Sequence, residues 1–279
     1  MSAIRTVTLP DGTRVPALGQ GTWGMGERRE RRAAEVAALR TGLDLGMTLV
    51  DTAEMYGDGG AEEVVGEAID GRRDEVFVVS KFYPQDAGRA QVQEACARSL
   101  ARLGIERLDL YLLHWRGATP LADTLAGLRD LMEAGAIARW GVSNLDRDDM
   151  EELWSLEGGE ACATDQVLYN VTERGPEFDL LPALRDRGVP MMAYSPIAQG
   201  GLPTHKLSDI AEKHGASPYR VALAFVLARE GVIAIPKAAS EEHLRDNRAA
   251  LDLVLDADDR AALDRAFPPP RSRQPLAVL

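Results

Sequence analysis

Residues 76–115, VFVVSKFYPQDAGRAQVQEACARSLARLGIERLDLYLLHW, contain two short apolar runs separated by an amphipathic stretch. The runs at 76–82 and 108–114 are apolar on both faces, which is typical of parallel strands that are covered on both sides. Residues 88–103 have the periodicity of a helix, and a helix is the usual crossover between parallel strands. The stretch therefore predicts one strand–helix–strand unit of a parallel sheet.

The same alternation extends along the chain. Eight strand-like runs, each followed by a helical segment, fit within 279 residues and predict a (β/α)8 TIM barrel. No linker divides the chain, so we expect a single domain over residues 1–279. An N-terminal β-hairpin is expected at residues 5–16, at the barrel bottom, with Asp11-Gly12 in its turn. The other strand runs are 17–23, 48–53, 138–144, 164–170, 190–197 and 232–238, and the other helical stretches include 120–134, 177–187 and 217–229.

Composition narrows the class of protein. The chain has 44 acidic and 32 basic residues, a formal net charge of −12, which argues against nucleic-acid or anionic-membrane partners. No run of about 18 apolar residues predicts a membrane span, and the N-terminal residues lack the apolar core of a signal peptide. Cys96 and Cys162 are too few for a disulfide framework, so we expect both thiols to be buried in a cytoplasmic protein. No metal site is expected, because no ligand cluster has the required spacing, and we expect a monomer.

Polar residues end most of the predicted strands. The carboxyl ends of the strands carry the chemistry in a (β/α)8 barrel, so these side chains should converge on one site. They are Asp51, Lys81, His114, Ser143, Asn144, Gln166, Tyr194, Ser195 and Lys237.

Three neighbouring strand ends, DTAEMYG (51–57), SKF (80–82) and LLHW (112–115), supply an Asp, a Tyr, a Lys and a His. A free Tyr has a pKa near 10, and a nearby ammonium lowers it by stabilising the phenolate. An Asp holds such an ammonium in place, and a His can orient a carbonyl oxygen. Together these groups can polarise a carbonyl and protonate its oxygen.

Each of these residues also has an ordinary structural explanation. Asp51 could cap a helix, Lys81 could end a strand as a solvated cation, and His114 could be a core residue. Their common order and spacing favour a catalytic site. In contrast, Gly19–Gly24 (GQGTWG) matches the dinucleotide-binding consensus GxGxxG in sequence but not in its expected structure. Trp23 occupies the turn and no helix follows directly, so we do not interpret it as a dinucleotide-binding motif.

The chain resembles the aldo-keto reductases, which carry an Asp–Tyr–Lys–His tetrad in this order, with the Tyr five residues after the Asp. The resemblance covers the whole chain and includes GVSN (141–144), DQVLYN (165–170), AYSPIAQG (193–200) and IPKAAS (235–240). Within the family, the chain looks most like bacterial enzymes that reduce methylglyoxal and other small aldehydes. The resemblance implies NADPH-dependent reduction of a small carbonyl substrate, with Asp51, Tyr56, Lys81 and His114 catalytic and Tyr56 the proton donor.

The resemblance also implies a cofactor site. Ser143, Asn144 and Gln166 would bind the nicotinamide carboxamide, Tyr194 would stack on its ring, and Lys237 would meet the 2′-phosphate. The segment Ser195–Gln199 would wrap the pyrophosphate. The full implied set is Gly21, Thr22, Trp23, Asp51, Ser143, Asn144, Gln166, Tyr194, Ser195, Pro196, Ile197, Ala198, Gln199, Ile235, Pro236, Lys237, Ala238, Ala239, Ser240, His243, Asp246 and Asn247.

The phosphate end departs from the commoner family pattern. Ala238 replaces a Ser, His243 stands where an Arg is usual, and Asp246 replaces a Glu. A neutral His is a weaker phosphate ligand than a guanidinium, so we expect a reduced preference for NADPH and some use of NADH. Arg245 compensates only if the helix turns it toward the pocket.

We expect the substrate pocket at Trp23, Met55, Tyr83 and Trp115, because these residues precede or follow the tetrad at the strand ends. The loop after His114 (WRGATP) and the tail at 268–279 are short, which predicts an open pocket for small carbonyls.

Two other functions remain open. Lys81 beside Asp51 and Tyr56 in a barrel is also what a Schiff-base aldolase needs, but such an enzyme has no use for the cofactor motifs. A cofactor-sensing, non-catalytic subunit would bind NADPH tightly and turn it over slowly.

Overall fold

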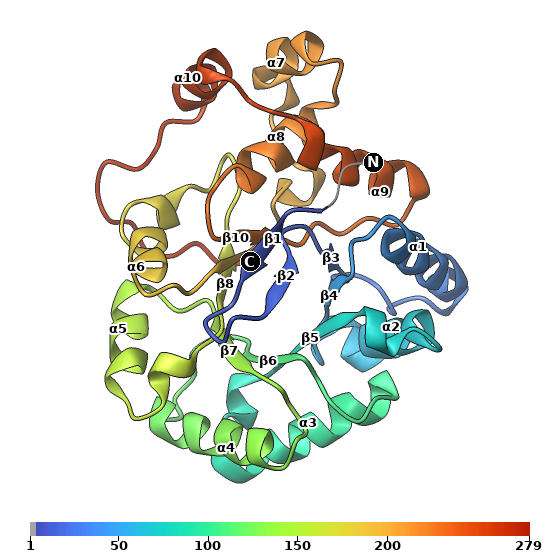
Figure 1. Ribbon diagram of the computed structural model, residues 1–279, viewed down its shortest axis with the longest axis vertical. Helices are drawn as coiled ribbons and strands as arrows, with labels where there is room; N and C mark the ends of the chain where they lie inside the picture. The colour runs from blue at the N-terminus through green and yellow to red at the C-terminus, as the bar shows by residue number, and fades with distance from the viewer. Residues whose placement is uncertain (1–3) are drawn as a thin grey trace.

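The computed structural model describes residues 4–279. Within them, eight parallel strands follow one another around a sheet in the order β10-β9-β8-β7-β6-β5-β4-β3 (Figure 1). Parallel bridges Leu18–Ala234 and Gly21–Lys237 join its two edges, so the sheet closes and the (β/α)8 barrel is confirmed. The strands are β3 (Gln20–Gly21), β4 (Leu49–Asp51), β5 (Phe77–Phe82), β6 (Leu110–Leu113), β7 (Trp140–Ser143), β8 (Asp165–Leu168), β9 (Met191–Tyr194) and β10 (Val232–Ala234).

Helices surround the barrel on its outer side (Figure 1). Local sequence fixes several of their ends: Asp146 caps α5 by accepting hydrogen bonds from the N–H groups of Asp148 and Asp149, and Gly104 ends α3 with φ 64°. The helix predicted at 177–187 is shorter in the structure, because Glu177 belongs to a separate 3-10 turn, Gly175–Glu177, and Asp179 takes a non-helical φ of −140°. The helices are α1 (Arg32–Asp44), α2 (Gly60–Ile69), α3 (Arg89–Leu103), α4 (Leu121–Glu133), α5 (Arg147–Ser155), α6 (Leu180–Asp186), α7 (Ser208–Lys213), α8 (Pro218–Leu227), α9 (Glu241–Ala249) and α10 (Ala257–Ala266).

The hydrophobic core has two layers. The larger one lies between the strands and the surrounding helices, and it includes the unpaired, buried Cys96 and Cys162. A smaller cluster fills the barrel interior with residues such as Leu49, Val79 and Leu110. The barrel is therefore packed rather than hollow.

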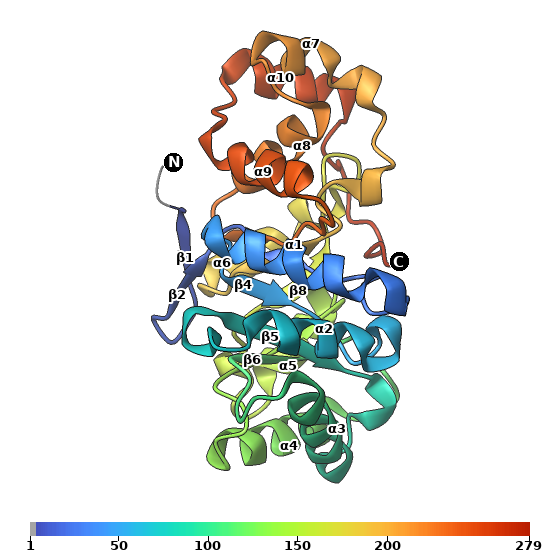
Figure 2. The same ribbon diagram turned by 90° about the vertical axis from the view of Figure 1, so that its right-hand side faces the viewer.

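The hairpin closes one end of the barrel. β1 (Thr6–Thr8) pairs antiparallel with β2 (Arg14–Pro16), and Gly12 takes φ 86° at the turn. The side chains of Leu9 and Val15 join the interior cluster. Figure 2 shows the hairpin at one end of the molecule and the C terminus at the other. The site must therefore be approached from the end opposite the hairpin.

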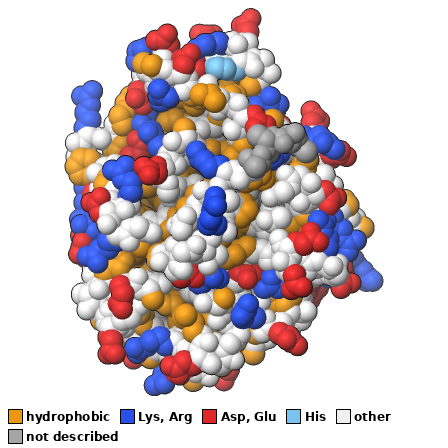
Figure 3. Space-filling model, viewed as in Figure 1, with side chains coloured by type: hydrophobic (Ala, Val, Ile, Leu, Met, Phe, Trp, Pro, Cys, Tyr) orange, Lys and Arg blue, Asp and Glu red, His pale blue; other side chains and the backbone are white. Residues whose placement is uncertain are grey.

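The hairpin face carries acidic and basic side chains interspersed, without a continuous basic area (Figure 3). Among residues 4–279, no helix combines the length and apolar character needed to span a bilayer.

Candidate active site

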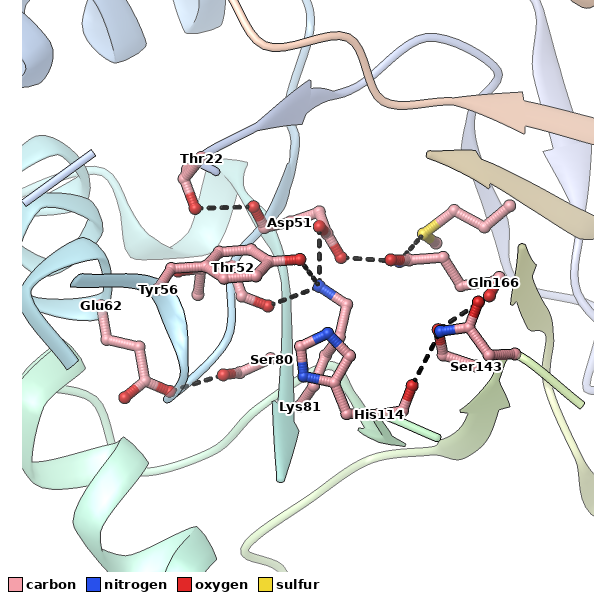
Figure 4. A network of polar contacts seen from close by, with 12 residues as sticks. Thr22, Asp51, Thr52, Tyr56, Glu62, Ser80, Lys81, His114, Ser143 and Gln166 are labelled. Carbon is pink, nitrogen blue, oxygen red and sulfur yellow. Dashed lines mark hydrogen bonds and ion pairs between the residues drawn. The ribbon is translucent and has the colours of Figure 1, made fainter. Parts of the chain in front are cut away.

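Three adjacent strands bring the predicted catalytic residues together (Figure 4). Asp51 ends β4, Lys81 lies near the end of β5, and His114 follows β6 directly. Tyr56 begins a short 3-10 turn, Tyr56–Gly59, between β4 and α2. The strand order predicted from the sequence thus places all four side chains at one end of the barrel.

Lys81 is the centre of this cluster. Its side chain is completely buried, and its Nζ donates hydrogen bonds to Asp51 Oδ2 at 2.8 Å, Thr52 O at 2.9 Å and Tyr56 OH at 3.1 Å. Burial disfavours the charged ammonium, but the combined effect of Asp51 and Tyr56 raises the pKa of Lys81 above its usual value. Lys81 is therefore a cation at neutral pH, beside the phenol oxygen.

The pKa of Tyr56 is shifted in the direction opposite to the one expected from the sequence. Burial raises it above 10, and the opposing effect of Lys81 is smaller. Asp51, held on its other oxygen by Gln166 Nε2 at 2.8 Å, adds to the increase. Tyr56 is therefore protonated at neutral pH, and this is the form that can donate a proton.

His114 lies next to Tyr56, with ring centroids 5.8 Å apart. Burial, with a smaller contribution from Lys81, lowers the pKa of His114 to about 2. Its buried Nδ1 has no hydrogen-bond partner within the described structure. His114 is therefore a neutral imidazole, and such a ring has one N–H group that can donate to a carbonyl oxygen.

The predicted carboxamide-binding residues form one hydrogen-bonded group. Ser143 Oγ donates to Gln166 O at 2.7 Å, and Asn144 Nδ2 donates to Ser143 Oγ at 3.1 Å and to His114 O at 3.0 Å. Tyr194 OH donates to Asn144 Oδ1 at 3.0 Å. Gln166 Nε2 also donates to Asp51 Oδ1, so the polar residues at the ends of β7, β8 and β9 are linked directly to the Lys81 cluster.

A cavity of about 690 Å³ opens over these residues. Such a volume is typical of a small-molecule or cofactor site. Its lining includes most of the predicted cofactor residues, but not Ala198, Pro236, Ala238, Ala239 or Ser240. The predicted residues that do line it are Gly21, Thr22, Trp23, Asp51, Ser143, Asn144, Gln166, Tyr194, Ser195, Pro196, Ile197, Gln199, Ile235, Lys237, His243, Asp246 and Asn247.

Sequence reasoning missed four lining residues, Gly24, Gly200, Tyr219 and Leu279. Tyr219 OH donates to Gly200 O at 2.8 Å, which fastens α8 to the loop after β9. Leu279 lines the cavity, and the C terminus lies at this end of the barrel, opposite the hairpin (Figure 2). No strand end or motif marks either residue in the sequence.

Comparison with known proteins places the chain in a family. The model of the aldo/keto reductase family matches residues 17–267. The chain belongs to this family. It is 51% identical to methylglyoxal reductase YeaE of Escherichia coli, over 95% of each chain, and 33% identical to glyoxal reductase of Bacillus subtilis, over 93% of this chain and 91% of that one.

Solved aldo-keto reductases share the fold closely. A structure from Klebsiella pneumoniae in complex with NADP and acetate has a TM-score of 0.96 and 50% identity, over 99% of this chain and all of that one. A second Klebsiella structure, in complex with NADPH, has the same score and identity over the full length of both chains.

One end of this reductase's cavity carries the residues that depart from the family pattern. Lys237 and His243 line it together, whereas the carboxylate of Asp246 accepts hydrogen bonds from Arg220 at 2.6 Å and Ser217 at 2.5 Å. Arg245 is turned away and pairs with Glu241 at 2.6 Å. Arg245 therefore does not compensate for the missing arginine at position 243.

At the other end of the reductase's cavity lie aromatic side chains. Trp23, half exposed, meets the ring of Tyr56 edge-on at 5.0 Å, and Trp115 packs against His114 at 4.9 Å. Met55 also lines the cavity. Tyr83 does not, but its ring packs edge-on against Trp115 at 5.9 Å and supports that wall from behind.

Proposed function

We propose that the chain is an NADPH-dependent reductase that converts small aldehydes and ketones of the methylglyoxal type to alcohols. The observation that carries the proposal is the contact of a buried, charged Lys81 with Tyr56 OH, 3.1 Å away, at the floor of the cavity. The names of its relatives in Escherichia coli and Bacillus subtilis, and the NADP-bound and NADPH-bound Klebsiella structures, support the same activity.

The residues of the cavity fit this cofactor. Ser143, Asn144 and Gln166 offer mixed donors and acceptors for an amide, and Tyr194 offers a flat face beside them. Lys237 supplies a positive charge for a phosphate at the far end. When bound, NADPH supplies the hydride.

The chain's own residues supply the proton and fix the carbonyl. Neutral His114 orients the carbonyl oxygen toward Tyr56, whose hydroxyl donates its proton to that oxygen. Lys81 stabilises the phenolate that remains, and Asp51 keeps Lys81 charged and in place. The rings of Trp23 and Trp115, which contact Tyr56 and His114, would pack against the substrate.

The geometry does not favour the aldolase. A Schiff base requires a neutral amine that the substrate can reach. Lys81 is fully buried, donates to three oxygens and has a raised pKa.

The test is loss of NADPH absorbance with methylglyoxal, measured for the wild type and Tyr56→Phe. We expect turnover by the wild type and a loss of several orders of magnitude in the variant, with NADPH binding retained. Turnover by Tyr56→Phe at the wild-type rate would remove Tyr56 from the acid role. Tight NADPH binding by a wild type without turnover would favour a sensing subunit, and borohydride trapping on Lys81 would identify an aldolase.

We also propose that the chain is a single barrel domain and a cytoplasmic monomer. The unpaired, buried Cys96 and Cys162 are compatible with a reducing compartment. Light scattering behind a sizing column measures the mass, which should equal that of one 30.3 kDa chain.

A further inference from the structure

The turn that carries Tyr56 has an unusual backbone. Gly57, Asp58 and Gly59 follow Tyr56 with φ of 59°, 53° and 87°, three consecutive residues in the left-handed region. Asp58 is not a glycine, and although Asp adopts this region more readily than most residues, the conformation still costs free energy. A strained turn keeps its shape only where its surroundings hold it.

Arg102, in the last turn of α3, lies directly against this turn. A Cβ added to Gly59 would lie 2.5 Å from Arg102 Cδ, so a larger residue there would displace the arginine side chain. Arg102 Nε donates to Glu62 Oε2 at 2.5 Å, whereas its Nη2 makes no hydrogen bond within the described structure and lies 3.7 Å from Glu54 Oε2, an ion-pair distance. Glu54 precedes Tyr56 by two residues and Glu62 follows it by six. One guanidinium therefore spans both flanks of the turn.

The same two carboxylates hold the strand that carries Lys81. Glu62 Oε1 accepts a hydrogen bond from Ser80 Oγ at 2.5 Å, as Figure 4 shows to the left of the Lys81 cluster. Glu54 Oε1 accepts one from the backbone N–H of Tyr83 at 2.9 Å. Ser80 and Tyr83 stand on either side of Lys81 in the sequence, so the two acids bracket it.

Burial makes the arginine necessary. Glu62 is fully buried and Glu54 nearly so, and a buried carboxylate without a cation is costly. Arg98 is the closer cation for Glu54, to which it donates at 3.4 Å, and it also binds Asp86 at 2.8 Å, but it does not contact Glu62. Arg102 is the cation that contacts both acids.

We propose that Arg102 is a positioning residue for the reduction: through its hydrogen bond to Glu62 and its charge beside Glu54, it fixes the Tyr56 turn relative to Lys81. The inference rests on the proposed function, in which Tyr56 is the acid. In this proposal, Arg102, Glu54 and Glu62 together set the distance between Tyr56 OH and Lys81 Nζ. A displacement of even about 1 Å at a reacting group can cost on the order of a hundredfold in rate.

The experiment compares Arg102→Met with the wild type and with Arg89→Met. Arg89 is the matched control, because it lies on the same helix and pairs with Asp130 at 2.6 Å without touching the turn. The measurements are NADPH dissociation constant by fluorescence quenching, KM for methylglyoxal, and kcat per NADPH-binding site across pH. Counting by NADPH-binding sites removes any loss of folded protein from the comparison.

For Arg102→Met we expect kcat to fall by about tenfold to a hundredfold, with little change in KM or NADPH affinity. The pKa of the basic limb of the kcat profile should rise, because the phenol moves away from the ammonium of Lys81. Arg102→Lys should restore part of the rate, since an ammonium can reach one acid but not span both. Arg89→Met should match the wild type.

A second variant, Glu62→Gln, keeps the side-chain volume. It tests the same proposal if Arg102→Met does not fold. The proposal would be overturned if the folded variants kept a kcat within about twofold of the wild type. The pKa of their basic limb would also have to lie within a few tenths of a pH unit of the wild-type value. The proposed function would still stand in that case, provided that Tyr56→Phe is inactive. Full activity of Tyr56→Phe would instead overturn the proposed function.

Discussion

Replacement of Lys81 by Met tests the central contact of the site. Met approximates the aliphatic part of the side chain, so the change chiefly removes an ammonium with three hydrogen bonds, at 2.8, 2.9 and 3.1 Å. Asp51, with a side chain only 3% exposed, then keeps Gln166 as its remaining side-chain donor. Breaking a buried ion pair from one side costs about 3–5 kcal/mol. We expect Lys81→Met to lose this much free energy of unfolding near pH 8.

The loss should depend on pH with a definite sign. Burial already raises the pKa of Asp51, and removal of Lys81 raises it further. A carboxyl whose folded pKa exceeds its unfolded value binds more protons when folded, so its destabilising effect is present above the folded pKa and fades as pH falls toward about 4. The difference between Lys81→Met and the wild type should therefore shrink between about pH 8 and pH 5.5.

Urea unfolding followed by tryptophan fluorescence measures the difference at both pH values. The double variant Asp51→Asn/Lys81→Met should recover most of the stability, because no buried charge remains, but it should not recover turnover. A deficit below about 1 kcal/mol, or one that does not change with pH, would refute the reasoning. So would a double variant as unstable as the single one.

Three other predictions follow from the same geometry. Because the pKa of His114 is lowered to about 2, the profile of kcat/KM should show no acid limb from this residue between about pH 5 and pH 8; a limb near 6.5 that His114→Gln abolishes would contradict this. His243→Arg should raise the preference for NADPH over NADH roughly tenfold, starting from a wild-type ratio of kcat/KM below about a thousandfold, since a charge-assisted hydrogen bond contributes about 1.5–3 kcal/mol. Cys96 and Cys162 should react with a thiol reagent only in denaturant, because both are buried and burial raises the pKa of Cys96 to about 12; labelling of the native protein, read by mass spectrometry, would show otherwise.

The residues at the strand ends could be predicted from the sequence, because a parallel barrel places its site at the carboxyl ends of successive strands. Asp51, Lys81 and His114 each close an apolar run, and the strand order alone brings them together. Gln166 and Tyr194 follow by the same rule from the opposite side of the barrel.

Other features depend on contacts that no local pattern encodes. Arg102 lies some 40 residues after the turn that it supports, in an amphipathic helix where an arginine is ordinary. The ion pair between Arg220 and Asp246 likewise joins two helices, α8 and α9. The sign of the Tyr56 shift depends on how deeply the phenol is buried, and spacing along the chain carries no measure of burial.

The seam of the barrel has a consequence for biogenesis. Gly21 and Lys237 pair across it, with Gly21 N–H donating to Pro236 O at 3.1 Å, and both line the cavity. During synthesis, the partner of the first strand leaves the ribosome more than two hundred residues later, so the ring cannot close before that segment is made. A nascent or truncated chain that lacks β10 has no complete dinucleotide pocket. Cofactor binding thus reports that the ring is closed, and by favouring the closed form it stabilises the newly completed protein.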